Sequence, residues 1–349
     1  MPKSITEQDV LNQLKTVMDP ELHKDLVSLG MIKDIQVGES NDVSFTIELT
    51  TPACPLRNRI ETDARQAVMQ LAGINQIKIN MSARVAQNQQ LKENVEIPVK
   101  NIIAVASGKG GVGKSTVTVN LALALANTGA KIGIMDADFY GPNVPTMMGV
   151  CEIPGPQNNK LIPAVAHGVK VMSIGFLVKP GQPLIWRGPL LHSTVRQFLV
   201  DVDWGDLDYL VVDLPPGTGD VQLSLAQHIP VTCGVIVTTP QKVSLDDASR
   251  GVEMFQKLDI PIAGVVENMG PMTLPDGSTL NIFGEGGGEN MATAYGLPFL
   301  GRIALDPEIR KYGDAGVPII RQSPDSMVAT QFNAIACEVA SFVSQLNLK

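Results

Sequence analysis

The sequence predicts an α/β protein in which a small α+β domain precedes a doubly wound, mostly parallel sheet. Three observations support this prediction. Aliphatic runs alternate with helical segments from residue 101 onward, a glycine-rich segment follows the first of these runs, and 349 residues exceed the size of one ordinary domain. We therefore expect domains at residues 1–84 and 101–349, with a polar, Gln- and Asn-rich linker at residues 85–100.

The first domain is predicted to contain a helix, two strands, a second helix and a third strand. Helical spacing of apolar residues ends before Pro20, and a turn-forming segment at residues 38–42 separates two alternating runs. The predicted elements are the helix 5–17, the strands 31–37 and 43–49, the helix 55–71 and the strand 74–81.

The second domain is predicted to hold six strands that are nearly continuous in aliphatic residues. Such strands are typical of a parallel sheet whose two faces are both covered by helices. Helices are expected at residues 115–127, directly after the glycine-rich segment, and at residues 324–346. The predicted strands are 102–106, 131–135, 169–173, 209–212, 234–237 and 262–266.

The composition argues against several classes of protein. With a net charge of -8 and 4% aromatic residues, the chain lacks the basic surface and stacking residues of a non-specific nucleic-acid binder. No apolar run approaches the ~18 residues that a membrane span requires. The first residues carry no apolar signal core, so we expect a cytoplasmic protein that binds neither nucleic acid nor membrane.

Residues 108–115 fit the phosphate-loop pattern G-x-x-x-x-G-K-S/T between a predicted strand and a predicted helix. Glycines let backbone N–H groups turn toward phosphate oxygens, and the N-terminus of the following helix attracts the same negative charge. Lys114 is expected to reach the β- and γ-phosphates of ATP, and Ser115 to ligate Mg²⁺. The residues expected to contact the nucleotide here are Gly108, Lys109, Gly110, Gly111, Val112, Gly113, Lys114, Ser115 and Thr116.

Two aspartates stand at the ends of predicted strands, where a nucleotide hydrolase needs carboxylates. Asp213 follows the aliphatic run 209–212 and is the expected second protein ligand of Mg²⁺. Asp138 follows the strand after the phosphate-loop helix and is the expected catalytic residue that orients the attacking water. Capping of a helix is the alternative role for Asp138.

The extra lysine of the loop, Lys109, makes the sequence Gly-Lys-Gly-Gly-Val-Gly-Lys-Ser. This sequence resembles the deviant Walker A motif of the family that contains the nitrogenase iron protein, the arsenite-pump ATPase and the MinD/ParA positioning ATPases. The resemblance implies that Lys109 crosses a homodimer interface to contact the partner's nucleotide, and that ATP drives dimerisation.

Further motifs are similar to those of the Mrp/ApbC branch, the iron–sulfur cluster carrier ATPases. This resemblance covers most of residues 101–320 and implies that Asn268 reads adenine and that apoprotein clients and scaffold proteins are partners. The motifs are Asp-Ala-Asp-Phe-Tyr-Gly-Pro-Asn at 136–143, Trp-Arg-Gly-Pro at 186–189, Asp-Leu-Pro-Pro-Gly-Thr-Gly-Asp at 213–220, Val-Glu-Asn-Met at 266–269, Phe-Gly-Glu-Gly-Gly at 283–287 and Gly-Arg-Ile-Ala-Leu-Asp-Pro at 301–307.

The first domain carries an independent resemblance. Its segments at 19–22, 25–32 and 51–56 are similar to a small domain that is shared by iron–sulfur assembly factors. Most members of the Mrp/ApbC branch also hold a bridging 4Fe–4S cluster on a C-x-x-C pair shortly after the Glu-Asn-Met segment. This chain has no cysteine at residues 270–278, so the usual cluster site is absent, and a cluster, if one is carried, needs thiolates from elsewhere in the chain.

Cys54 is the candidate ligand, because it precedes Pro55 at the expected N-cap of the helix 55–71, where a thiolate is favoured. The alternative is a small, partly buried residue. Cys233 and Cys337 lie in apolar segments and are expected in the core, and Cys151 lies in a Pro/Gly-rich loop. The four cysteines predict neither a disulfide framework nor a closed intrachain metal site.

Three functions remain open. The first is an ATP-hydrolysing, homodimeric carrier that transfers iron–sulfur clusters to apoproteins. The second is a MinD/ParA-like positioning ATPase, which predicts a basic amphipathic tail, whereas residues 341–349 hold one cation. The third is an ATP-switched scaffold that carries no cluster.

Overall fold

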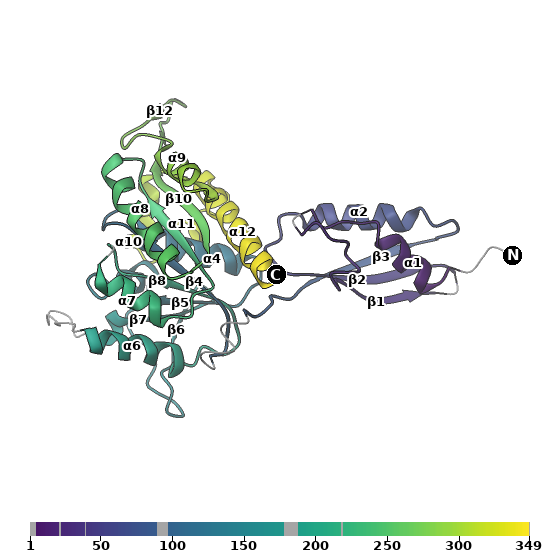
Figure 1. The fold of residues 1–349 in the computed structure, drawn as a ribbon, viewed down its shortest axis with the longest axis horizontal. Helices are drawn as coiled ribbons and strands as arrows, with labels where there is room; N and C mark the ends of the chain where they lie inside the picture. The colour runs from purple at the N-terminus through teal and green to yellow at the C-terminus, as the bar shows by residue number, and fades with distance from the viewer. Residues whose placement is uncertain are drawn as a thin grey trace. The chain divides into compact units, whose positions relative to one another are not determined.

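A computed structural model describes residues 5–20, 22–38, 40–88, 97–177, 188–217 and 219–348 of the chain. The chain forms two compact units, Met1–Ala86 with Ser344–Lys349, and Gln87–Val343 (Figure 1). Parts of the sequence motifs lie outside the described residues. They are Glu21, linker residues 89–96, Trp186, Arg187 and Thr218.

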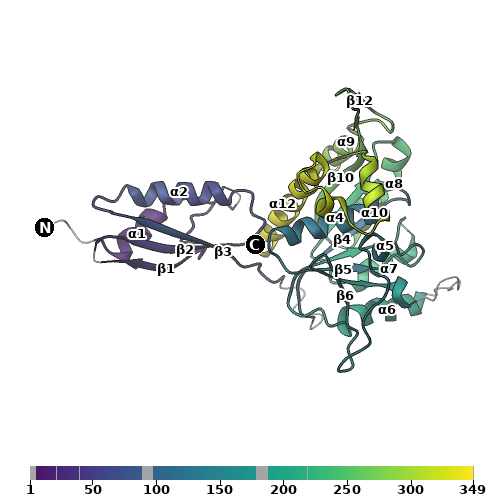
Figure 2. The ribbon, with the colours of Figure 1, turned by 180° about the vertical axis from the view of Figure 1, so that it is seen from behind.

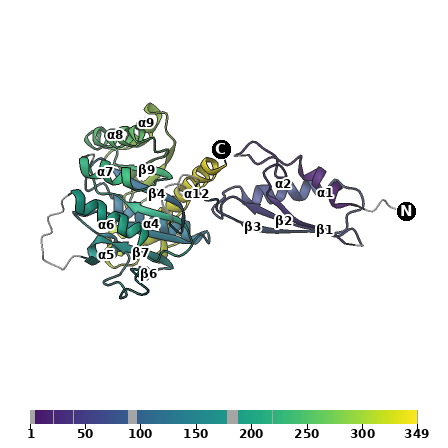
Figure 3. The same cartoon turned by 60° about the horizontal axis from the view of Figure 1, so that its bottom comes forward.

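The first unit is a three-stranded sheet with two helices on one face (Figure 3). The strand order is β1-β2-β3, with β2 antiparallel to β1 and parallel to β3. Strict alternation along β2 buries Val43, Phe45, Ile47 and Leu49 against the helices, as a half-covered sheet requires. The bounds are α1 Glu7–Leu14, β1 Ile32–Val37, β2 Val43–Leu49, α2 Arg57–Met69 and β3 Ile77–Ala83.

The second unit is built on an eight-stranded sheet in the order β13-β10-β9-β4-β8-β5-β7-β6, in which only β6 is antiparallel to its neighbour. The strand bounds are β4 Val99–Ser107, β5 Ile132–Asp136, β6 Ala164–Ala166, β7 Val169–Ser173, β8 Leu207–Asp213, β9 Cys233–Thr238, β10 Ile262–Gly270 and β13 Phe299–Ala304. A separate hairpin pairs β11 Met272–Thr273 with β12 Thr279–Leu280.

Helices cover both faces of this sheet, as the front and rear views show (Figures 1 and 2). The core between them includes Trp204 and Phe255, which are fully buried. The Trp204 indole N–H donates to the Phe198 carbonyl at 2.8 Å, which satisfies its polar group inside the core. The helix bounds are α4 Lys114–Asn127, α5 Val144–Met147, the 3₁₀ helix η1 Ile174–Leu177, α6 Gly188–Val200, α7 Asp220–His228, α8 Lys242–Lys257, α9 Gly287–Ala294, α10 Pro307–Asp314, α11 Ile319–Gln322 and α12 Met327–Asn347.

The predicted fold class is confirmed, and all six predicted strands are present. The strand β4 begins at Val99, inside the predicted linker, because Val99 pairs with Leu207 of β8 and is buried. Four strands were not predicted from their pattern. They are β13, where Gly301 and Arg302 interrupt the apolar run, the three-residue β6, and the two strands of the hairpin. Among the described residues, no helix is both long and apolar enough to cross a membrane.

Candidate functional site

The phosphate-loop segment lies between β4 and α4, at the carboxyl edge of the sheet, where ligands bind in open α/β folds. Gly111 and Gly113 have φ values of 83° and 85°, a left-handed conformation that favours glycine. A Cβ on Gly108 would stand 2.1 Å from the backbone carbonyl carbon of Asp247, so α8 packs directly against the loop. The loop can therefore take this path only with glycine at position 108.

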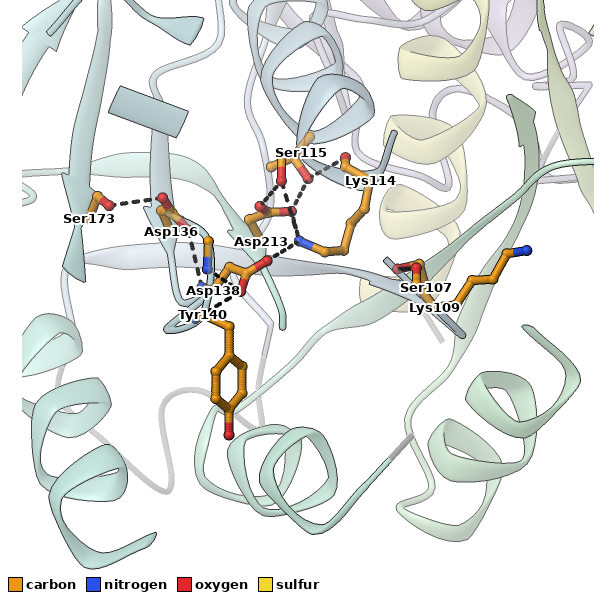
Figure 4. Close-up of polar contacts among 11 residues, drawn as sticks. Ser107, Lys109, Lys114, Ser115, Asp136, Asp138, Tyr140, Ser173 and Asp213 are labelled. Carbon is orange, nitrogen blue, oxygen red and sulfur yellow. Dashed lines mark hydrogen bonds and ion pairs between the residues drawn. The ribbon is translucent and has the colours of Figure 1, made fainter. Parts of the chain in front are cut away.

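Lys114 lies in a cluster of acidic and hydroxyl side chains at the start of α4 (Figure 4). Its ammonium is 2.8 Å from Asp213 Oδ1 and 3.5 Å from Asp138 Oδ2. The Ser115 hydroxyl donates to Asp213 Oδ2 at 2.6 Å, and the Thr118 hydroxyl donates to Asp213 Oδ1 at 2.7 Å. The structure thus brings together four predicted residues and adds Thr118, which lies one helical turn after Lys114 on the same face.

The acidic side chains of this cluster differ in their protonation equilibria. Burial, followed by the charge of Asp213, raises the pKa of Asp136 to about 8, while hydrogen bonds from Ser173 Oγ at 2.8 Å and from the Asp138 backbone oppose the rise. Burial also raises the pKa of Asp138, and the Lys114 ammonium opposes that shift. One buried cation therefore stands among acidic groups of which Asp136 favours its neutral form near neutral pH.

Asp138 is not a helix cap, because α5 begins after Asn143. Its Oδ1 instead accepts hydrogen bonds from the backbone N–H groups of Tyr140 and Gly141, both at 3.2 Å. These bonds hold the carboxylate toward Lys114 while the other oxygen, Oδ2, faces the ammonium. The alternative role as a helix cap is therefore wrong. Asp138 instead stabilises the turn that follows β5.

Two cavities meet at the N-terminus of α4. The first has a volume of about 360 Å³ and is lined by the phosphate loop with Asp138, Tyr140 and Pro216. The second has a volume of about 210 Å³ and is lined by Asn120, Asn268 and residues of α10. Gly113, Thr116 and Met147 line both, so the two cavities adjoin along these residues, and together they are called the groove.

Asn268 lines the smaller cavity and contacts the phosphate loop directly. Its side-chain amide donates to the Val112 carbonyl at 2.8 Å, and the residue is buried. A Cβ on Gly113 would stand 2.1 Å from that amide nitrogen, so the amide occupies the space that glycine leaves. The predicted residue Asn268 therefore lies beside the predicted loop, although it is 156 positions away from Val112 in the sequence.

Lys109 is separate from the Lys114 cluster. Its side chain extends away from that cluster (Figure 4), although the residue lines the larger cavity. The Ser107 hydroxyl donates to its carbonyl at 3.0 Å, which ties the loop backbone to the end of β4. The structure thus leaves the Lys109 ammonium directed outward from its own site.

The donor set of the site fits Mg²⁺. Ser115 and Asp213 present a hydroxyl and a carboxylate, which are hard oxygen ligands, beside the cavity that the phosphate loop lines. Among the described residues, no group of three or more His, Cys, Asp or Glu side chains is arranged to hold a metal ion by itself. Two protein ligands would fill only part of the octahedral coordination of Mg²⁺, so oxygens of a bound phosphate or of water would have to supply the rest.

Cys54 lies in the first unit, half-buried against its core. The predicted N-cap position was wrong: α2 begins at Arg57 with Leu56 as N-cap, because residues 55 and 56 form a turn closed by the Arg57 N–H and the Cys54 carbonyl at 3.3 Å. Among the other thiols, Cys233 is confirmed as a core residue, and burial raises its pKa to about 12. Cys151 is exposed, and Cys337 is half-buried rather than in the core.

Comparison with known proteins decides the family. Residues 98–340 match the family described as "ParA: NUBPL iron-transfer P-loop NTPase", and residues 7–81 match "Iron-sulfur cluster assembly protein". The chain belongs to this iron–sulfur carrier family of P-loop NTPases. The predicted resemblance of both domains is thereby confirmed.

Relatives within the carrier family match the chain over almost its whole length. The "Iron-sulfur cluster carrier protein" of Synechocystis sp. is 49% identical over 353 residues, covering 99% of each chain. The protein of the same name from Deinococcus radiodurans is 50% identical over 340 residues, covering 96% of this chain and 95% of that one. These carrier-family relatives therefore match both domains of the chain, in the same order.

Solved structures resemble the second unit. A nucleotide-binding protein from Archaeoglobus fulgidus in complex with ADP is 38% identical, with a TM-score of 0.57 over 65% of this chain and 90% of that one. The cell division ATPase MinD of Pyrococcus furiosus is 24% identical, with a TM-score of 0.52 over 68% of this chain and 98% of that one. The second likeness shows a shared fold.

Proposed function

We propose that this protein is a homodimeric ATPase that carries iron–sulfur clusters to apoproteins in the cytoplasm. The observation that supports it most directly is the contact of Lys114, Ser115 and Asp213 at the mouth of a glycine-built phosphate loop. Within this proposal, residues 1–84 form the assembly-type domain, 85–100 the linker and 101–349 the ATPase domain.

The nucleotide is proposed to lie along the groove at the N-terminus of α4. Its phosphates occupy the 360 Å³ cavity, where the orphan N–H groups of the first helical turn attract negative charge. Its adenine occupies the 210 Å³ cavity beside Asn268. The Lys114 ammonium, which now contacts Asp213 and Asp138, then contacts the β- and γ-phosphates instead.

Ser115 and Asp213 are the proposed protein ligands of Mg²⁺, which when bound neutralises charge that develops on the phosphates. Asp138 orients the attacking water, since its carboxylate is fixed by two backbone N–H groups and faces the larger cavity. Asp213 keeps its place through the hydroxyl groups of Ser115 and Thr118. These side chains therefore hold the reacting groups in one orientation.

Lys109 is proposed to act on the nucleotide of the partner protomer. Its side chain extends away from its own Lys114 cluster, as an interaction in trans requires (Figure 4). ATP binding would then close a homodimer, and hydrolysis would reopen it. This cycle gives the carrier two states that differ in access for scaffold proteins, which load a cluster, and for client apoproteins, which receive it.

Cys54 is the proposed ligand of the cargo, a 4Fe–4S cluster. Iron–sulfur clusters require thiolates, and Cys233 is excluded because its thiol is fully buried and its pKa is raised. The hairpin β11–β12 and its flanks contain no cysteine. Cys54 is half-buried at a turn that precedes a helix, which leaves part of its surface accessible.

Anaerobic cluster reconstitution tests this function. We expect the wild-type protein to bind iron and sulfide and to transfer them to an apo-ferredoxin, and Cys54→Ser to do neither. Cys151→Ser is the matched control, because this thiol is exposed in a loop of the other unit. If the wild type retains no cluster, the protein is instead an ATP-switched scaffold, the second candidate that the cysteine-free hairpin favours.

A further inference from the structure

Asn268 lies in an irregular stretch of β10. The pairing of β10 with β9 ends at Glu267, and its register with β13 shifts between Glu267 and Gly270. Met269 has a φ of 56°, a left-handed conformation that is unfavourable for a residue with a side chain. Regular ladder bonds therefore do not fix Asn268, and its place depends on the residues that flank it.

Glu267 anchors the residue before Asn268. Its side chain is fully buried, and one carboxylate oxygen accepts from the Gly286 N–H at 3.1 Å and from Arg302 Nε at 2.5 Å. The other oxygen accepts from the Gly288 N–H at 2.6 Å. Three donors, one of them charged, thus hold this carboxylate in a single orientation.

Two glycines leave the space that this arrangement needs. A Cβ on Gly288 would stand 2.9 Å from the Glu267 Cβ, and a Cβ on Gly270 would stand 2.6 Å from the Arg302 Cδ. Gly270 also anchors the far side of Asn268, because its carbonyl accepts from the Leu305 N–H at 3.1 Å. The strand is therefore fixed immediately before and immediately after the irregular stretch.

We propose that Glu267 is a positioning residue for the base of the nucleotide, acting through Asn268. This inference rests on the proposed function, in which the cavity beside Asn268 takes the adenine of ATP. The only hydrogen bond of the Asn268 side chain to a described residue goes from its amide to the Val112 carbonyl. The other polar groups of the Asn268 side chain are then left to form hydrogen bonds with the base. They face it only while the Glu267 carboxylate holds the strand in place.

The test compares ATP with inorganic tripolyphosphate, which has the phosphates and no base. Glu267→Gln places an amide where three N–H donors need a carboxylate. We expect its Kd for ATP to rise about tenfold, because an unpaired buried donor displaces the strand, while its Kd for tripolyphosphate changes less than about twofold. Glu285→Gln is the matched control and should leave both Kd values unchanged, since Glu285 is exposed and contacts the same arginine at 3.1 Å.

Equal weakening of both ligands in Glu267→Gln, or weakening of neither, would overturn the proposal. If Glu267→Gln does not fold, Arg302→Lys provides the same comparison, because it keeps the charge and loses the geometry of the guanidinium. An unchanged ratio of the two Kd values in Arg302→Lys would also overturn it. A wild-type protein that binds tripolyphosphate and shows no preference for ATP would instead contradict the proposed function.

Discussion

Lys114 is the one cation among the described residues that directly contacts Asp138 and Asp213, and its side chain is 5% exposed. Its position suits it both to the fold and to the chemistry proposed above. Without nucleotide phosphates the ammonium compensates buried carboxylates, and in the proposed reaction it compensates phosphate charge. The same electrostatic requirement, a cation beside concentrated negative charge, holds in both cases.

Replacement of Lys114 by Ala is expected to abolish ATP hydrolysis, with a fall in kcat of at least about 100-fold, because the phosphate charge loses its nearest cation. Initial rates of phosphate release measure this. Lys100→Ala is the control: Lys100 forms an ion pair with Asp208 at 2.8 Å at the opposite end of β4. It should lower the free energy of unfolding without changing kcat, and hydrolysis by Lys114→Ala at the wild-type rate would contradict the mechanism.

Asp136 predicts a pH dependence of stability. Its pKa is raised to about 8 in the folded protein from 3.8, so between these values the folded state binds a proton that the unfolded state has lost. The contribution of this group to the free energy of unfolding is full below the lower pKa value. It decreases as the pH rises between the two pKa values and is lost above the upper pKa value.

We therefore expect Asp136→Asn to make the free energy of unfolding fall less steeply with pH between about 5 and 7, by up to about 1.4 kcal/mol per pH unit. Urea denaturation at several pH values measures the slope. Asp276→Asn should leave the slope unchanged, because hydrogen bonds from Ser278 lower the pKa of this exposed carboxyl below that range. A slope in Asp136→Asn identical to that of the wild type would show that Asp136 is ionised in the folded protein.

At the scale of elements, the contact between the phosphate loop and α8 determines which glycines are indispensable. Gly108→Ala would place a Cβ 2.1 Å from the Asp247 backbone, and neither backbone segment can yield easily. We expect the free energy of unfolding to fall by about 1–3 kcal/mol and ATP binding to weaken, because the loop must shift away from α8. Denaturant unfolding and calorimetric titration with ATP measure the two effects.

Gly110→Ala is the matched control for this prediction. Its Cβ would have Pro216 Cγ as nearest atom, at 3.9 Å, and its φ is not in the left-handed region. The variant should retain the stability of the wild type. If the two variants were destabilised equally, loss of glycine flexibility, rather than contact with α8, would explain the effect.

The sequence predicts those elements whose pattern is local. Aliphatic runs predict the six central strands, and the phosphate-loop pattern predicts Lys114 and Ser115, because both depend on neighbouring residues. Asp213 follows from the rule that parallel strands end at a common edge. In contrast, β13 was not predicted, since Arg302 within it is explained only by Glu267 on a neighbouring strand.

The same limit explains the error at Cys54 and the residues that were not anticipated. The residue Pro55 is compatible with the first turn of a helix, and nothing in the sequence shows that a turn delays α2 until Arg57. Thr118 and Ser173 form their hydrogen bonds to aspartates 95 and 37 residues away, so only the folded chain brings them together. Tertiary contacts, rather than local preferences, complete the site.

At the scale of the whole molecule, the proposed homodimer makes each active site depend on two chains. In the proposed arrangement, a protomer supplies Asp138 to its own nucleotide and Lys109 to that of its partner. Lys109→Ala and Asp138→Asn homodimers should each be inactive, because every site then lacks one of the two groups. Both homodimers would also be inactive if Lys109 acted in cis. Only a dimer that contains one protomer of each variant distinguishes action in trans from action in cis.

Mixing the two variants provides the decisive measurement. In a mixed dimer, the site on the Lys109→Ala protomer keeps its own Asp138 and receives Lys109 from its partner, so it is complete. Random exchange gives mixed dimers in half of the population with one complete site each, and we expect about a quarter of the wild-type rate of ATP hydrolysis. Lys131→Ala in place of Lys109→Ala controls for general effects of removing an exposed lysine, since Lys131 lies 3.5 Å from Asp206 on the surface. If Lys109 acted in cis, no site in any mixed dimer would be complete and the mixture would stay inactive.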